Sequence, residues 1–127
     1  MPNYLTKELQ KCKHPTPWWA QYESHQWTRP NYGATKQLEN TLDNSPPITE
    51  ECKRRIQKIV GNFLYYARAA DCTMMTSLNQ IAKKQARPTQ NTKSAIEKIL
   101  EYASTNTTAV VKFRASDMVL HIDIDAS

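Results

Sequence analysis

The sequence predicts an α+β fold in three zones, and three observations lead to it. Prolines interrupt residues 1–47, which hold all three tryptophans and are expected to form an irregular N-terminal arm. Apolar residues recur at helical spacing through residues 48–106, which indicates a bundle of three helices. Apolar and polar residues alternate in residues 107–127, which favours a C-terminal β-hairpin.

The N-terminal arm begins with a short predicted helix over residues 4–12, because Leu5, Leu9 and Cys12 share one helical face. The prolines that follow exclude a long helix or a central strand. Aromatic side chains gather in this segment: Trp18, Trp19, Tyr22, Trp27 and Tyr32. Such side chains usually clamp a loop onto the body of a domain, which is the interpretation that we favour over an exposed base-stacking platform.

The first long helix is predicted to begin after Thr49, since Glu50 and Glu51 suit the positive end of a helix dipole. Its apolar stripe consists of Cys52, Ile56, Ile59, Val60, Phe63, Ala67 and Ala70. A second helix starts at Asp71 or Thr73 and ends before Pro88, and a third begins at Thr89. Three amphipathic helices joined by short turns indicate a small bundle.

The last zone alternates with a period of two. Leu120, Ile122 and Ile124 share one face of the second predicted strand, while Asp123 and Asp125 share the other. Two carboxylates on one face suit Mg²⁺, but they are too few for two-metal chemistry. The simpler interpretation is that both aspartates are exposed to solvent on the strand and bind no metal. A hairpin without further strands leaves its edges uncovered, so we expect self-association through it.

Composition limits the classes of function. Only two residues are glycine, against about nine expected, which excludes the Gly-rich phosphate loops of nucleotide-binding enzymes. The three cysteines are widely spaced and form no Cys-x-x-Cys pair, which indicates reduced thiols and an intracellular, cytoplasmic or nuclear protein. No run of apolar residues approaches 18, so we expect no membrane segment. The net charge of +5 is concentrated in residues 47–106, which contain ten Lys or Arg and five Asp or Glu residues. This surplus favours an anionic partner.

The basic charge forms a line on the first long helix, opposite its apolar stripe. Steps of four, three, four and three residues place five positions on that face: Arg54, Lys58, Gly61, Tyr65 and Arg68. Such cations can follow a phosphate backbone, Tyr65 offers a ring to a sugar or base, and Gly61 permits close approach. The alternative is a solvated face whose glycine accommodates another helix, and composition alone leaves both open.

Residues 59–71 read Ile-Val-Gly-Asn-Phe-Leu-Tyr-Tyr-Ala-Arg-Ala-Ala-Asp, which resembles the Val-Gly-x-Leu-x-Tyr helix of copia-type retrotransposon reverse transcriptases. Residues 88–105 are similar to the Pro-Thr and Arg-Ile-Leu-Arg-Tyr segment that follows in this family. Residues 1–5 read Met-Pro-Asn-Tyr-Leu, similar to the stretch after the polymerase palm. The last three residues, Asp-Ala-Ser, resemble the start of a ribonuclease H domain.

This resemblance spans essentially the whole chain. It implies a thumb and connecting region that contacts a primer–template duplex, either RNA–DNA or DNA, and it favours the binding interpretation of the basic line. It also implies that Asp125 matches the first catalytic, metal-binding carboxylate of ribonuclease H, with Mg²⁺ as the metal of the parent enzyme. The chain contains no Tyr-x-Asp-Asp motif.

We therefore expect a fragment of a retrotransposon polyprotein that is no enzyme by itself and needs no cofactor. Two other functions stay open. One is a stand-alone nucleic-acid-binding remnant, and the other is a protein-interaction module that uses the Trp-rich arm.

Overall fold

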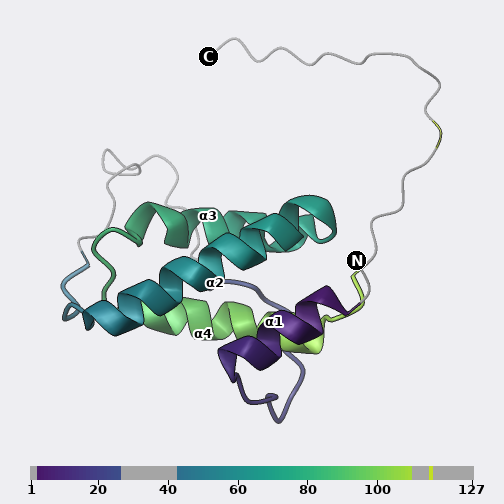
Figure 1. Ribbon diagram of the computed structural model, residues 1–127, viewed down its shortest axis with the longest axis horizontal. Helices are drawn as coiled ribbons and strands as arrows, with labels where there is room; N and C mark the ends of the chain where they lie inside the picture. The colour runs from purple at the N-terminus through teal and green to yellow at the C-terminus, as the bar shows by residue number, and fades with distance from the viewer. Residues whose placement is uncertain (1–2, 27–42, 110–114, 116–127) are drawn as a thin grey trace, which may run out of the picture.

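Four α-helices and one short 3₁₀ helix make up the regular structure of residues 3–26, 43–109 and 115, which the computed structural model describes (Figure 1). In chain order these are α1 (Tyr4–Cys12), α2 (Glu50–Ala69), the 3₁₀ helix η1 (Cys72–Met74), α3 (Met75–Lys84) and α4 (Gln90–Thr105). The longest helix, α2, contacts all the others. It crosses the centre of the view, with α3 on one side and α4 on the other.

The predicted α+β class is wrong. No strand occurs in residues 3–26, 43–109 or 115, where the β-type pairing is one isolated bridge between Pro47 and Thr89. The predicted hairpin lies almost entirely outside the described residues. Alternation of apolar residues was poor evidence for a sheet because two strands alone are marginally stable, and the described part supplies no third strand to pair with them.

The bundle also has one helix more than predicted. The helix expected over residues 4–12 is confirmed, but it is not an isolated piece of an irregular arm. It packs on α2 and α4, and its Leu5 and Leu9 join the hydrophobic core. The described domain is therefore a four-helix assembly in which the first helix is separated from the second by residues 13–49.

The helix starts follow local chemistry, as the sequence predicts. The Thr49 hydroxyl accepts a hydrogen bond from the backbone N–H of Cys52, 3.4 Å away, and so caps α2. Asp71 caps η1 by accepting from the backbone N–H of Thr73. Thr89 and Thr92 form a reciprocal capping box at the start of α4.

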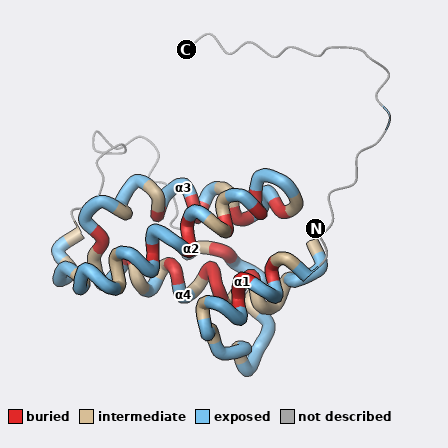
Figure 2. The backbone as a smooth tube through the Cα atoms, viewed as in Figure 1, coloured by how far each residue is buried: buried red, intermediate tan, exposed pale blue. Residues whose placement is uncertain are grey.

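One core lies between the helices, and Figure 2 marks its buried positions in red along the helices. The predicted stripe of α2 is buried from Ile56 to Ala67, while Cys52 and Ala70 are half-buried. The largest fully buried apolar side chains come from α2, η1, α3 and α4. They are Phe63, Met74, Leu78, Ile99 and Leu100. The sequence interpretation missed Tyr66, which is also buried.

The segment before α2 is attached to the start of α4. The Asp43 carboxylate accepts hydrogen bonds from Ser45, from the Thr89 hydroxyl and from the Asn91 amide. These bonds, those from Ser45 and Thr89 foremost, hold the pKa of Asp43 far below its usual range. Backbone bonds from Ile48 to Pro88 and from Gln90 to Pro46 complete the attachment. They place the N-terminus of α2 beside that of α4.

In residues 3–26 and 43–109, no helix is both long and apolar enough to cross a membrane.

Replacing Leu5 with Ala tests whether α1 belongs to the core. Leu5 is only 2% exposed, so Leu5→Ala should lower the free energy of unfolding by about 2–5 kcal/mol, the range for removing a buried leucine side chain. The exposed neighbour Thr6 is the control, and Thr6→Ala should change it by no more than about 0.5 kcal/mol. Urea unfolding followed by circular dichroism measures both, and equal effects would contradict the four-helix assembly.

Candidate nucleic-acid interface

The predicted line on α2 is exposed along its whole length. All five positions (Arg54, Lys58, Gly61, Tyr65 and Arg68) lie on the solvent side of the helix, opposite the buried stripe. The structure thus brings these residues together on one face because α2 is a continuous helix of 20 residues. Whether they bind nucleic acid stays a prediction.

Gly61 faces open space. A methyl group added at its Cα would meet no described atom of another element within 4 Å, so no neighbouring helix in the described residues requires the glycine. This excludes close helix packing in residues 3–26 and 43–109 as the reason for Gly61. Without a side chain at this position, the helix backbone itself is open to close approach.

Tyr65 is held by aromatic neighbours although it is 60% exposed. The ring of Tyr4 from α1 lies 5.9 Å from that of Tyr65, tilted by 58°, and stacks on the buried ring of Tyr66 at 6.0 Å. The Tyr4 hydroxyl donates to the backbone carbonyl of Asn62, 3.4 Å away. Tyr4 therefore orients the exposed ring, a role that sequence reasoning missed because the two helices are far apart in the chain.

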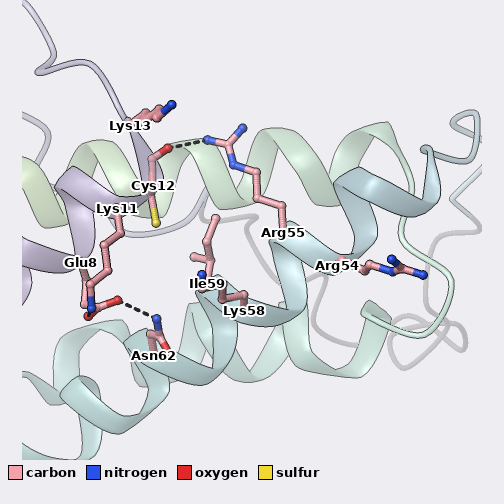
Figure 3. A pocket seen from close by; sticks show the side chains of 9 residues that line it. All are labelled: Glu8, Lys11, Cys12, Lys13, Arg54, Arg55, Lys58, Ile59 and Asn62. Carbon is pink, nitrogen blue, oxygen red and sulfur yellow. Dashed lines mark hydrogen bonds and ion pairs between the residues drawn. The ribbon is translucent and has the colours of Figure 1, made fainter.

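An open groove of about 510 Å³ lies between α1 and α2 (Figure 3). Two cations of the line, Arg54 and Lys58, border it, and three more come from outside the line, namely Lys11, Lys13 and Arg55. The remaining lining residues are Glu8, Cys12, Ile59 and Asn62. Sequence reasoning missed the three added cations. Their signal was the run of basic residues at 53–55 and the Lys-x-Lys spacing at 11–13.

Glu8 is the acidic residue of the groove and it is almost completely buried. Its carboxylate lies 2.6 Å from the Lys11 ammonium and 2.6 Å from the Asn62 amide nitrogen, which donates to it. The bond from Lys11 lowers the pKa of Glu8 most, and the bond from Asn62 acts in the same direction against the effect of burial. Glu8 is thus charged and compensated, and it ties α1 to α2.

Arg55 crosses the groove from α2 to the end of α1, as Figure 3 shows. Its Nη2 donates to the Cys12 carbonyl over 3.0 Å. That carbonyl belongs to the last turn of α1, where backbone oxygens lack helical partners and attract cations. The neighbouring Cys12 thiol is half-buried, and burial raises its pKa, so it is a neutral thiol at neutral pH.

The expected clamping of aromatic residues onto the domain is wrong for those that the structure describes. Trp18 is 98% exposed, Trp19 72% and Tyr22 80%. Polar contacts hold this segment instead. The backbone N–H of Gln21 donates to Thr105, the Asn106 amide donates to the Gln21 carbonyl, and Lys98 pairs with Glu23 at 3.2 Å. Trp27 and Tyr32 lie outside the described residues.

The two candidate metal ligands on the last strand, Asp123 and Asp125, also lie outside the described residues. Elsewhere, residues 3–26 and 43–109 contain no cluster of three or more His, Cys, Asp or Glu side chains placed to hold a metal ion.

Comparison of the chain with protein-family models, curated proteins and solved structures finds no match. The described residues therefore define a class by their architecture alone, a small all-α bundle with a basic exposed face.

His14 follows the groove residue Lys13 and is half-buried. Its Nε2 is buried and makes no hydrogen bond to any described residue. Burial lowers the pKa of His14 most. Glu101 and Glu97 act to raise it, and Arg55 acts to lower it. The folded protein therefore binds a proton at His14 less readily than the unfolded chain does.

A pH dependence of stability follows from His14. Well above pH 6.5 the imidazole is neutral in both the folded and the unfolded protein, so His14 adds no pH dependence to the free energy of unfolding there. Below that value the unfolded chain takes up the proton first, so stability falls as the pH drops from 6.5 toward the lower pKa of the folded state. Urea unfolding at pH 7.5 and 5.5 should show a smaller loss for His14→Gln than for the natural chain. His25→Gln is the control and should retain the loss. An unchanged loss in His14→Gln would contradict the assignment.

Proposed function

We propose that this chain binds a nucleic-acid duplex through the exposed face of α2, as the thumb and connecting region of a reverse transcriptase does. The supporting observation is the continuous exposed line that combines three cations, one oriented ring and one open glycine. In this proposal the chain is a fragment of a copia-type retrotransposon polyprotein. It contributes to duplex binding and has no polymerase or nuclease centre of its own.

The dimensions of the line suit a duplex backbone. From Arg54 to Arg68 the helix rises by roughly 21 Å, at about 1.5 Å for each residue. One DNA strand passes about six phosphates over that length, since its charges are about 3.4 Å apart along the axis. Contacts of Arg54, Lys58 and Arg68 to phosphates release counterions, which favours binding and makes it dependent on salt.

Gly61 and Tyr65 complete the surface between the cations. Gly61 lets the backbone of the duplex come close to the helix, and Tyr65 is positioned to contact a sugar. None of these contacts reads a base edge, so the proposed binding is independent of sequence.

Protein interaction through the N-terminal arm is the second candidate. It is favoured by the exposure of Trp18, Trp19 and Tyr22 on a segment whose backbone is fixed by contacts to α4. Large exposed aromatic side chains are typical of interaction sites. A double Trp18→Ala, Trp19→Ala variant separates the two candidates, because duplex affinity should survive it.

Neutralising the line tests the duplex proposal directly. A triple variant Arg54→Gln, Lys58→Gln, Arg68→Gln should bind a 20-base-pair duplex more weakly and reduce the slope of log affinity against log salt by about 3, one for each lost phosphate contact. Fluorescence anisotropy over a salt series measures both quantities.

The control for this triple variant carries the same loss of charge. Lys83→Gln, Lys84→Gln, Arg87→Gln removes three exposed cations at the C-terminal end of α3 and just beyond it, outside the line. This control should keep most of the salt slope. If both triple variants lost affinity and salt slope equally, net charge alone would explain the binding, and a defined interface on α2 would be contradicted.

Gly61→Ala should affect stability and binding in opposite directions. Because nothing described lies within 4 Å of the added methyl group, alanine should raise the free energy of unfolding by about 1 kcal/mol through its higher helix propensity. The same methyl group obstructs close approach of a backbone and should weaken duplex binding. Urea unfolding and anisotropy on one preparation test the pair, and a stabilised variant with unchanged affinity would place the duplex elsewhere.

A further inference from the structure

We propose that the groove between α1 and α2 is a phosphate-binding site, in which Lys13 and Arg55 hold a backbone phosphate of the duplex that lies along α2. This inference rests on the proposed function and adds residues from a second helix to it. The ligand is an anionic phosphate group. It can be a phosphodiester within the backbone of a strand or a phosphate at the end of a strand.

The first argument is the convergence of charge. Helices α1 and α2 lie side by side although their groove residues, 8–13 and 54–62, are more than 40 positions apart in the chain. Their cations line one open groove (Figure 3). The groove has a volume of about 510 Å³ and is open to solvent. A phosphate with its attached sugar fits that space.

The second argument is the balance of charge inside the groove. Glu8 is compensated at 2.6 Å by Lys11, so this pair adds no net charge. The other four cations, Lys13, Arg54, Arg55 and Lys58, form no ion pair with another described residue. Their mutual repulsion is relieved when an anion enters, which is the condition that favours phosphate binding.

The third argument is that the Arg55 side chain is held in position before a ligand binds. One Nη2 bond to the Cys12 carbonyl fixes the guanidinium across the groove, and a guanidinium carries five N–H donors. The remaining donors make no hydrogen bond to other described residues and can grip two phosphate oxygens at once. A fixed guanidinium loses little conformational entropy on binding.

The fourth argument connects the groove to the line. Arg54 and Lys58 belong to both surfaces, so a duplex whose phosphates contact these two side chains passes over the mouth of the groove. Lys13 at the end of α1 and Arg55 of α2 then hold the next phosphate in the groove. The duplex is contacted by two helices, which restricts its rotation about the axis of α2.

The test uses a double variant, Lys13→Asn with Arg55→Gln. Lys13 has a left-handed backbone with φ of 51°, which asparagine tolerates better than most residues, so this change removes charge without adding strain. The variant should bind the duplex about tenfold more weakly at 0.1 M salt and lower the salt slope by about 1, because Lys13 and Arg55 hold the same phosphate. Lys83→Gln with Lys84→Gln has the same charge and should stay within about twofold of the natural chain.

Two further variants guard against a folding defect. Arg55→Lys keeps the charge and removes the planar fork, so the salt slope should be retained while affinity falls. Glu8→Gln removes the negative charge and keeps an acceptor for Asn62, so duplex binding should become a few times tighter. Urea unfolding of each variant shows that it is folded, and a loss of affinity in Glu8→Gln would overturn the proposal.

A titration with inorganic phosphate separates failure of this site from failure of the proposed function. Backbone amide shifts of Cys12, Lys13 and Arg55 should move together and saturate in the natural chain, and they should not move in the double variant. If phosphate binds there but the duplex does not bind at all, the groove stands and the proposed function fails. Amide shift changes spread evenly over all exposed Lys and Arg residues would contradict a phosphate site in the groove.

Duplexes with and without a 5′-phosphate separate the two sources. Equal losses for both duplexes in the double variant support the backbone phosphodiester. A loss confined to the 5′-phosphorylated duplex would overturn that assignment in favour of the strand end.

Discussion

The burial of one face of α2 is the constraint on which the rest of the described structure depends. Phe63 lies on this face and is fully buried in the core that α2 shares with the other helices. A helix that buries one face must present the opposite face to solvent when no further element covers it. The cations of the line are therefore exposed as a consequence of packing, and their alignment follows from the same helical period.

The contact between α1 and α2 determines the form of the basic surface. Leu5 and Leu9 attach α1 through the core, and the Glu8 carboxylate ties it to Asn62. This attachment brings Lys11 and Lys13 to the side of α2 and places Tyr4 against Tyr65. A single row of charges on one helix thereby becomes a two-walled groove beside an oriented aromatic ring. Removal of the core contact of α1 would thus alter the surface as well as the stability.

Local sequence signals predicted the helices well. The bounds expected for α1 agree with the structure, and Thr49 and Thr89 cap the helices that they were expected to start. The second helix was expected to start at Asp71 or Thr73, but Asp71 caps the 3₁₀ helix η1 and α3 itself begins at Met75. These signals succeed because capping and helical periodicity depend on residues within a few positions of one another. The α+β class was wrong because alternation over a few residues does not supply the partner strands that a sheet needs. The clamping of Trp18 and Trp19 was wrong because burial depends on what space the packed helices leave.

The sequence by itself determined the positions of the helices, the apolar stripe of α2 and the row from Arg54 to Arg68, since each follows from the period of the α-helix. Only the tertiary structure decided that α1 joins the bundle, that Lys13 and Arg55 share a groove and that the aromatic residues from Trp18 to Tyr22 face solvent. The physical reason is that these features depend on contacts between segments far apart in the chain. Such contacts are selected by the fit of side chains in three dimensions, which no local spacing encodes.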